Sequence, residues 1–299
     1  MLLYSGSSNK TLAEKIAKDS TISLGNIEKT VFPDGETRIR VVDDVLEKDA
    51  SILQSGAKFP EYYYFELFFL LDALKRRGAK NLTAIVPYLG YQRQDHLFRE
   101  GEAVSLDVII QTLESLSLSK LITFDLHSIK IPELFHVPVV HLSALPIFAE
   151  KIKSLGVKNS DLVIVSPDMG GIRRINILSD LLGGVETAKI NKDRDLESGE
   201  ISSAKIEGAV KEAAIIVDDM ISTGRTIIAA ANLLKKKGAK KIFVFATHPV
   251  FSFDDPKVFD DNSIQKVFVS DTIEIEERNK FPKLEILSVA SLIAEEIKK

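Results

Sequence analysis

Residues 213–247 read AAIIVDDMISTGRTIIAAANLLKKKGAKKIFVFAT and contain the pattern that decides the fold. An apolar run of strand length is followed by a polar turn, a helical pattern with a basic end, and a second apolar run. Continuous apolar runs are typical of strands that are covered on both faces. A strand, a helix and a strand in this order therefore predict parallel pairing in an α/β sheet.

The same alternation of strand and helix patterns continues along most of the chain. The predicted strands cover 50–54, 82–88, 120–126, 161–167, 213–219 and 241–247. The predicted helices cover 61–77, 103–117, 143–155, 171–182 and 224–237. The first of these helices is so rich in aromatic residues that we expect it to be buried. The fold class is therefore α/β, with parallel sheets flanked by helices.

Two parts of the chain resemble each other. KRRGAKNLTAIVP (75–87) is similar to KKKGAKKIFVFAT (235–247), and each follows a helical pattern and ends in an apolar run. ASILQSG (50–56) precedes the first copy much as AIIVDDM (214–220) precedes the second. A basic helix end, a glycine and a strand also form a generic α/β junction. The paired similarity nevertheless favours a duplicated domain, in which only the second copy carries the acidic loop.

Length and composition limit the remaining possibilities. A chain of 299 residues exceeds the usual single-domain size, and we expect two tandem domains, 1–145 and 146–299. The hydrophobic share of 45% and the charged share of 27% argue against a disordered or a membrane protein. A net charge of -4 offers no basic surface for nucleic acid. The absence of cysteine excludes disulfides and thiolate zinc sites, and favours a cytoplasmic location.

The turn after the predicted strand 213–219 joins adjacent carboxylates to small hydroxylated residues and glycine. It lies at the carboxyl edge of the predicted sheet, where such folds bind ligands. Backbone N–H groups at the following helix N-terminus can hold a phosphate, whereas paired carboxylates accept hydrogen bonds from sugar hydroxyls. Helix capping explains Ser222 but not two carboxylates on a strand end. We therefore expect a sugar phosphate, bound by Asp218, Asp219, Ser222, Thr223, Gly224, Arg225 and Thr226.

These residues lead to a family resemblance. VDDMISTGRT (217–226) resembles the phosphoribosyl-diphosphate signature of type I phosphoribosyltransferases and of ribose-phosphate diphosphokinases, also called PRPP synthetases. PYLGYQRQD (87–95), DLHS (125–128), SPDMGG (166–171) and FPDGE (32–36) resemble the synthetase motifs in order and spacing. The resemblance implies two type I phosphoribosyltransferase-like domains. It also implies an enzyme that transfers the diphosphoryl group of Mg-ATP to the anomeric hydroxyl of ribose 5-phosphate, giving 5-phosphoribosyl diphosphate and AMP.

PYLGYQRQD predicts an exposed loop after a strand. An arginine fork matches polyphosphate oxygens, and glutamine or aspartate can accept from an adenine amine or hold a metal-bound water. By itself, such a loop is more often solvated surface. The resemblance implies that Arg93, Gln94 and Asp95 bind ATP. It also implies a homo-oligomer, in which Phe32, Asp34 and Glu36 hold the adenine of a neighbouring subunit's ATP.

DLHS and SPDMGG each follow a predicted strand. A histidine in this position can bind a metal or a triphosphate, although a lone histidine is more often structural. Glycines before a helix admit a diphosphate close to backbone N–H groups, which suits Asp168, Met169, Gly170 and Gly171. The resemblance supports Mg²⁺ as the cofactor, with His127 and Asp168 as ligands, although histidine is an unusual magnesium ligand. The other histidines, His96, His136, His141 and His248, are expected to be structural.

AKINKDRDLESGEIS (188–202) is rich in charge and poor in apolar anchors, which predicts a mobile loop. Without further context it is a solvated linker. The resemblance implies the catalytic flexible loop of the family, in which Lys192 and Arg194 act together with His127. Two cations on a closing loop can neutralise charge on a transferring phosphoryl group, while the closed loop excludes water.

Two other functions stay open. A phosphoribosyltransferase would consume the same product, but it needs neither an ATP loop nor a duplicated domain. A catalytically silent partner of the synthetase would keep the fold while losing the loop cations, yet Lys192 and Arg194 are both present.

Overall fold

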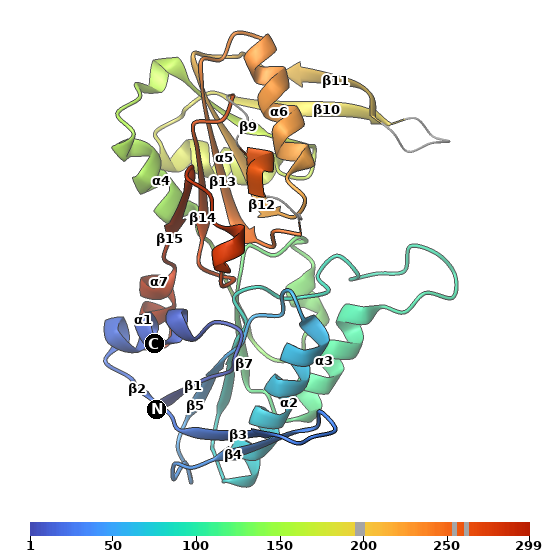
Figure 1. Ribbon diagram of the computed structural model, residues 1–299, viewed down its shortest axis with the longest axis vertical. Helices are drawn as coiled ribbons and strands as arrows, with labels where there is room; N and C mark the ends of the chain where they lie inside the picture. The colour runs from blue at the N-terminus through green and yellow to red at the C-terminus, as the bar shows by residue number, and fades with distance from the viewer. Residues whose placement is uncertain (195–200, 253–255, 260–262) are drawn as a thin grey trace. The chain divides into compact units, whose positions relative to one another are not determined.

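The computed structural model describes residues 1–194, 201–252, 256–259 and 263–299 (Figure 1). The chain forms two compact units. The first contains Met1–Leu142, Thr272–Glu274 and Ser288–Lys299, and the second contains Ser143–Asp271 and Ile275–Leu287. The C-terminal residues thus belong to the first unit, whereas we expected them in the second domain. The reason is that helix α7 (Ala290–Glu296) packs against helix α1 (Lys10–Ser20) of the first unit.

The first unit is built on a parallel sheet with the strand order β2-β1-β5-β6-β7-β8. Its strands are β1 (Leu2–Ser5), β2 (Ser23–Leu24), β5 (Ala50–Leu53), β6 (Leu82–Ile85), β7 (Lys120–Phe124) and β8 (Val139–Leu142). An antiparallel hairpin, β3 (Ile27–Val31) and β4 (Thr37–Val41), stands apart from this sheet. The longer helices are α2 (Pro60–Arg76) and α3 (Ser105–Ser115), and a 3₁₀ turn covers Ile131–Leu134.

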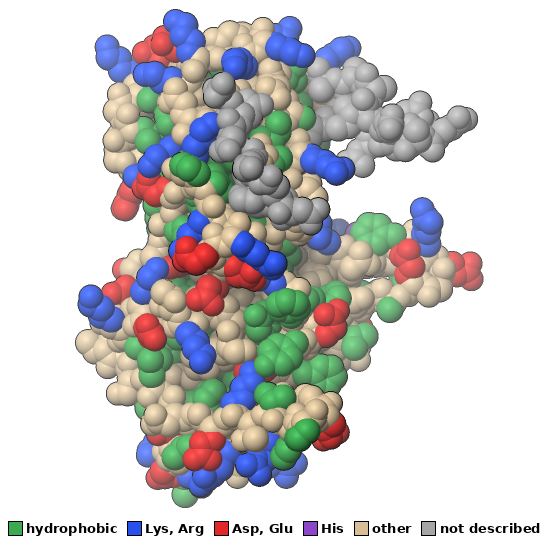
Figure 2. Space-filling view, viewed as in Figure 1, with side chains coloured by type: hydrophobic (Ala, Val, Ile, Leu, Met, Phe, Trp, Pro, Cys, Tyr) green, Lys and Arg blue, Asp and Glu red, His purple; other side chains and the backbone are tan. Residues whose placement is uncertain are grey.

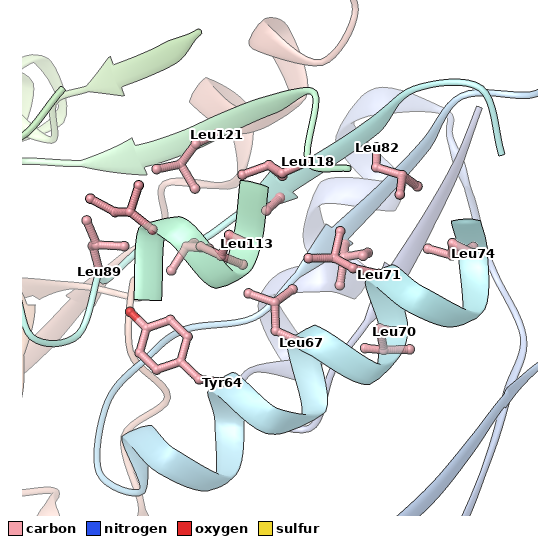
Figure 3. Close-up of a cluster of buried hydrophobic side chains, with 14 of the residues drawn as sticks. Tyr64, Leu67, Leu70, Leu71, Leu74, Leu82, Leu89, Leu113, Leu118 and Leu121 are labelled. Carbon is pink, nitrogen blue, oxygen red and sulfur yellow. The ribbon is translucent and has the colours of Figure 1, made fainter. Parts of the chain in front are cut away.

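Helix α2 presents two different faces. The buried face is mostly leucine at a spacing of three or four residues, so it forms one stripe that packs with α3 on the sheet (Figure 3). Burying each such side chain contributes roughly 1.5–3 kcal/mol. The other face carries Tyr62, Phe65 and Phe69, which are 44%, 59% and 41% exposed. Figure 2 shows hydrophobic side chains at the surface over this part of the first unit. The expectation of a buried helix is therefore correct for its leucine face and wrong for its aromatic face.

The second unit is built on a sheet with the order β11-β10-β9-β12-β13-β14-β15, parallel except for the β10–β11 pair. Its strands are β9 (Leu162–Ser166), β10 (Thr187–Arg194), β11 (Ile201–Glu207), β12 (Ala213–Ile221), β13 (Lys241–Pro249), β14 (Lys266–Ser270) and β15 (Leu284–Leu287). Its helices are α4 (Leu145–Ser154), α5 (Ile172–Leu181) and α6 (Arg225–Lys236), with 3₁₀ turns at Asn159–Asp161, Pro256–Phe259 and Glu277–Asn279.

Helices cover both faces of the second sheet. On one face, Ile227 and Leu234 of α6 join a cluster of buried valines and alanines from the strands. On the other face, Phe148 of α4 lies 5.4 Å from the ring of Phe245, which stacks on Phe268 at 4.5 Å. Continuous apolar strands are explained by this two-sided cover. Among the described residues, no helix combines the length and the apolar character needed to cross a bilayer.

The expected fold class is confirmed, and the two sheets share their strand order. β1-β5-β6-β7-β8 in the first unit corresponds to β9-β12-β13-β14-β15 in the second. The repeated sequences fall on β5 and β12 and on β6 and β13. In each unit an antiparallel hairpin lies between the first two of these strands in the chain: β3–β4 in one and β10–β11 in the other. The topology therefore agrees with a duplicated domain.

The expected mobile loop 188–202 is wrong as secondary structure. Strands β10 and β11 extend through most of it, so that Lys192 pairs with Ala204 and Arg194 with Ile201 in an antiparallel ladder. Residues 195–200 lie outside the described residues. The two strands satisfy each other's backbone groups, and for this reason the hairpin forms although its sequence offers few apolar anchors.

A buried carboxylate holds the strand ends of the first unit together. Glu66 of α2 is 3% exposed and accepts from the Ser7 N–H at 3.0 Å, and from the Ser7 hydroxyl, Gln54 Nε2 and Lys29 Nζ at 2.6 Å each. Ser7 follows β1, Gln54 follows β5, and Lys29 belongs to β3. Burial alone raises the pKa of Glu66, but the hydrogen bonds from Lys29, Ser7 and Gln54 outweigh it and lower that pKa.

Glu66→Gln should destabilise the protein by about 3 kcal/mol, since a buried ion pair that loses one partner leaves the other charge uncompensated. Because the pKa of Glu66 is lower in the folded chain than in the unfolded one, its ionised form stabilises the fold above the ordinary value of 4.5. This stabilisation is lost as the pH falls through the folded pKa. Urea unfolding at pH 7 and in acid measures both effects.

Asp72→Asn is the matched control, because Asp72 pairs with Arg76 on the exposed part of the same helix. Its effect should stay below about 0.5 kcal/mol. Equal losses for the two variants would contradict a special role for Glu66.

Candidate active site

The acidic pair lies on the part of β12 that extends beyond its neighbour β9. Pairing with β9 stops at Ile216, whereas pairing with β13 continues to Ile221, two residues past the expected strand end. Asp218 Oδ1 accepts from the Asp219 N–H at 2.9 Å, and Asp219 Oδ1 accepts from the Met220 N–H at 3.0 Å. Local backbone donors thus hold both carboxylates at the carboxyl edge of the sheet.

Arg174 of α5 joins the two carboxylates, a contact that the sequence analysis missed. Its Nη1 lies 3.4 Å from Asp218 Oδ1 and its Nη2 lies 3.7 Å from Asp219 Oδ1. All three side chains are at most 15% exposed. The sequence did contain a signal for this contact. Arg173 and Arg174 lie in the first turn of α5, where the positive end of the helix dipole disfavours cations. Such a placement indicates a specific anionic partner.

One arginine does not neutralise this acidic site. Burial raises the pKa of the Asp218 carboxyl well above its ordinary value. The charge and the hydrogen bond of Asp219 raise it further, Arg174 opposes the rise, and the charge of Asp168 adds to it. The edge therefore holds excess negative charge, which hydroxyl donors or a cation can stabilise.

The SPDMGG segment forms a tight turn between β9 and α5. Ser166 Oγ donates to the Asp168 carbonyl at 2.7 Å, and Asp168 Oδ1 accepts from the Gly170 N–H at 2.9 Å. A Cβ at Gly171 would lie 2.4 Å from Ser166 Oγ and 3.2 Å from Arg174 Nη1. Glycine is thus required where the turn packs against the Ser166 side chain. Asp168, Met169 and Gly170 are exposed, so the turn is accessible to a ligand.

The turn after β12 leads into an uncapped helix. Helix α6 begins at Arg225, one residue after the predicted start, so Arg225 and Thr226 belong to its first turn. Gly224 is the N-cap with φ 74°, a conformation that favours glycine, and no side chain caps the helix. The Ser222 hydroxyl lies 3.2 Å from that of Ser252. The first N–H groups of α6 are therefore available to an anion.

The expected ATP loop follows β6 in the first unit and is anchored by close backbone contact. The Gly56 N–H donates to the Tyr88 carbonyl at 2.9 Å, and a Cβ at Gly90 would lie 2.2 Å from the Gly56 carbonyl oxygen. Beyond this anchor, Arg93 and Gln94 are exposed. Asp95 is more enclosed, and its Oδ1 lies 2.6 Å from Nδ1 of His96, which we expected to be structural.

FPDGE forms the turn of the β3–β4 hairpin. The Phe32 N–H donates to the Glu36 carbonyl at 2.8 Å, and Asp34 Oδ1 accepts from the Glu36 N–H at 3.2 Å. Phe32 is 40% exposed, with the guanidinium carbon of Arg38 5.7 Å from its ring centre. Within the part of the chain that the structure describes, no hydrogen bond or ion pair joins this turn to the expected ATP loop of the same chain.

DLHS follows β7 in an irregular conformation. Asp125 has a φ of 29°, which is rare for a residue other than glycine. The Leu126 N–H donates to Nε2 of His141 at 2.9 Å, and the His127 N–H donates to Oε1 of Gln92 at 2.8 Å. His127 itself is exposed. His127 was identified from the sequence and His141 was expected to be structural, but the contact of Gln92 with this loop was not anticipated.

The structure brings together part of the predicted site. In the second unit, the SPDMGG turn, the acidic pair and the phosphate turn share one sheet edge, with Arg174 linking the first two. In the first unit, Gln92 links the ATP loop to DLHS. His127 and Asp168, the expected metal ligands, belong to different units. Among the described residues there is no group of three or more His, Cys, Asp or Glu arranged to hold a metal ion.

Paired carboxylates and an uncapped helix at the carboxyl edge of a parallel sheet suit an α/β protein that binds a phosphorylated sugar. Residues 1–116 match the N-terminal domain of ribose phosphate pyrophosphokinase, and residues 200–299 match the phosphoribosyl synthetase-associated domain. The chain is 35% identical to a ribose-phosphate pyrophosphokinase of Fusobacterium nucleatum, over 99% of this chain and 93% of the relative. It belongs to the ribose-phosphate pyrophosphokinase family.

Two further similarities agree with this assignment. A ribose-phosphate pyrophosphokinase of Bacillus cereus is 36% identical, over 99% of this chain and 92% of the relative. The solved structure of phosphoribosylpyrophosphate synthetase from Mycobacterium smegmatis is 34% identical and superimposes with a TM-score of 0.92, over 99% of this chain and 97% of that one. The resemblance noted from the sequence motifs is thus confirmed at the level of the family.

Asp218→Asn should make the protein more stable at pH 7, by about 1 kcal/mol, because binding sites commonly hold destabilising features. The pKa of Asp218 is higher in the folded chain than in the unfolded one, so its ionisation weakens the fold as the pH rises. The amide removes that charge and keeps an oxygen that can accept from the Asp219 N–H. The difference in unfolding free energy between Asp218→Asn and the wild type should become smaller as the pH is lowered toward about 4.

The same change should weaken binding of ribose 5-phosphate by roughly 1–3 kcal/mol, since one sugar hydroxyl loses its charged acceptor. Urea unfolding and calorimetry measure the two quantities. Asp180→Asn, on the exposed part of α5, is the control and should change neither. A less stable Asp218→Asn protein with full sugar affinity would refute this description of the site.

Proposed function

We propose that the chain transfers the β,γ-diphosphoryl group of ATP to the anomeric hydroxyl of ribose 5-phosphate, giving 5-phosphoribosyl diphosphate and AMP. The chain is a ribose-phosphate pyrophosphokinase, a transferase of nucleotide biosynthesis. The observation that carries the proposal is the acidic pair on β12, followed within a few residues by the uncapped N-terminus of α6. The cytoplasmic location stays a prediction.

The second unit binds ribose 5-phosphate. Asp218 and Asp219 accept hydrogen bonds from the ribose hydroxyls, which relieves the repulsion between the two buried carboxylates. The 5-phosphate lies at the α6 N-terminus, where the residues 222–226 offer backbone N–H groups, hydroxyls and the Arg225 side chain. One strand-turn-helix segment thus orients both ends of the sugar.

The SPDMGG turn receives the diphosphate. The exposed turn from Asp168 to Gly170 lies beside the acidic pair, with Gly171 where the chain packs against Ser166. Mg²⁺, when bound, neutralises charge on the phosphate oxygens. Asp168 suits it as a ligand because Mg²⁺ prefers one or two carboxylates together with substrate phosphates, and His127 is the second proposed ligand.

The first unit binds ATP through Arg93, Gln94 and Asp95, whose loop is anchored by Gly56 and Gly90. Phe32, Asp34 and Glu36 hold the adenine of a neighbouring subunit's ATP. Two observations support this sharing. The hairpin turn makes no polar contact with the ATP loop of its own chain among the described residues, and it presents an exposed aromatic ring.

Transfer proceeds by in-line attack of the anomeric oxygen on the β-phosphorus. Lys192 and Arg194, on the β10 strand, stabilise the charge on the transferring group. Positioning of the two substrates supplies much of the remaining barrier reduction. We assign no residue as the general base that takes the proton of the anomeric hydroxyl. Formation of AMP from ATP and ribose 5-phosphate tests the function. A phosphoribosyltransferase or a silent partner protein would form none.

Lys192→Ala should lower kcat by roughly 10²-fold or more, as expected for the loss of one preorganised electrostatic donor. Dissociation constants for both substrates should change by less than about threefold, because the contact forms in the transition state. Lys205→Ala, an exposed lysine on the partner strand β11, is the control and should keep full activity. If the Lys192→Ala enzyme kept half of the wild-type kcat at saturating Mg-ATP, Lys192 would have no place in the mechanism.

The shared ATP site predicts complementation between variants. Phe32→Ala and Arg93→Ala should each lose most activity, since each damages a different half of the pocket. Mixed oligomers contain some interfaces with two intact halves, so mixing the two proteins should restore part of the activity. Activity and light scattering are measured together on the mixture. A fully active monomer, or a mixture no more active than its components, would show that the site lies within one chain.

A further inference from the structure

A buried amide joins the two loops of the first unit that carry its proposed site residues. Gln92 immediately precedes Arg93 in the ATP loop and is 1% exposed. Its Oε1 accepts from the His127 N–H at 2.8 Å. Its Nε2 is one of two buried side-chain atoms in the described residues that have no hydrogen-bond partner, the other being Oγ1 of Thr123.

The orientation of this amide follows from the one hydrogen bond that it makes within the described part of the chain. The His127 N–H is a donor and requires an oxygen, so the reversed amide would bring two donors together. Nε2 is therefore the end without a partner. An orphaned buried donor costs more free energy than one neutral hydrogen bond contributes. For stability alone, an apolar side chain of the same length would be at least as good at position 92.

The hydrogen bond matters for the shape of the DLHS loop. Regular pairing ends with β7 at Phe124, and the next residue adopts the positive φ of 29°. Two side-chain acceptors then hold the backbone: His141 Nε2 at Leu126 and Gln92 Oε1 at His127. The place of His127 is thus set by side chains from β8 and from the ATP loop. Gln92 thus leaves one buried donor without a partner while it fixes the backbone of His127. Such a cost in stability is typical of residues that serve function.

We propose that Gln92 is a positioning residue of the ATP site. It fixes the backbone of His127 relative to the loop that carries Arg93, so that the imidazole and the guanidinium meet the polyphosphate of Mg-ATP in a set geometry. The proposal rests on the proposed function, because it assigns a role within the same ATP site. It concerns the first unit alone and needs no movement of either loop.

Gln92→Met tests the proposal, since methionine has a similar length and volume but no hydrogen-bonding group. It removes the orphaned donor together with the acceptor, and water can replace the acceptor at the exposed His127. The melting temperature should stay the same or rise. We expect kcat/KM for Mg-ATP to fall about tenfold, the lower end for losing a group that orients a ligand. The KM for ribose 5-phosphate should not change.

A double-mutant cycle separates positioning from a general packing effect. If Gln92 acts through His127, adding Gln92→Met to His127→Ala should cause no further loss. Thr123→Val is the matched control, because it removes the other orphaned buried group, on β7, and keeps the shape of the side chain. It should leave kcat/KM for both substrates at the wild-type value.

NMR of the ligand-free protein gives a readout that does not depend on catalysis. In Gln92→Met, the backbone amide resonance of His127 should shift, and its proton should exchange with solvent faster than in Thr123→Val. Full kcat/KM for Mg-ATP in Gln92→Met, an equal loss in the His127→Ala background, or an unchanged His127 resonance would each overturn the proposal. An inactive wild-type protein would instead reject the proposed function, and the resonance would still report whether Gln92 holds His127.

Discussion

The pairing of β12 with β13 beyond the end of β9 is the constraint on which the site depends. Asp218 and Asp219 therefore lie beyond the last residue that pairs with β9, while pairing with β13 still fixes the backbone of this part of β12. Two adjacent carboxylates with so little exposure repel each other, and burial raises the pKa of Asp218. Arg174 and the local backbone donors reduce that repulsion without cancelling it.

The two units differ in how the carboxylates near the ends of the equivalent strands β5 and β12 are satisfied. In the first, Glu66 receives Lys29, Gln54 and two donors from Ser7, so that its pKa is lowered and the edge is satisfied from within. In the second, the pKa of Asp218 is raised and the N-terminus of α6 has no side-chain cap. The end of β5 is therefore satisfied within the fold, whereas we propose that the end of β12 binds a ligand, in line with the trade-off between stability and function.

Local sequence patterns were sufficient for the framework of both units. The expected strands at 82–88, 120–126 and 161–167 and the helices at 103–117 and 171–182 are present, each within a few residues of the predicted ends. These elements are long or strongly apolar, so their periodicity is clear. The hairpin β10–β11 was missed because its strands are charged and are stabilised by each other. The aromatic face of α2 was misplaced because aromatic content does not indicate which face is covered.

The sequence by itself determined the parallel α/β class, the duplication, the family and the motifs that carry Asp168, His127, Asp218 and Asp219, because these depend on residue order along short segments. Only the tertiary structure decided the partners of those residues. Arg174, Gln92 and His141 are far in sequence from the carboxylates and the N–H groups that they contact. Their roles arise where separate loops meet at the end of a sheet, and the direction of a side chain across such a gap is not encoded in any local pattern.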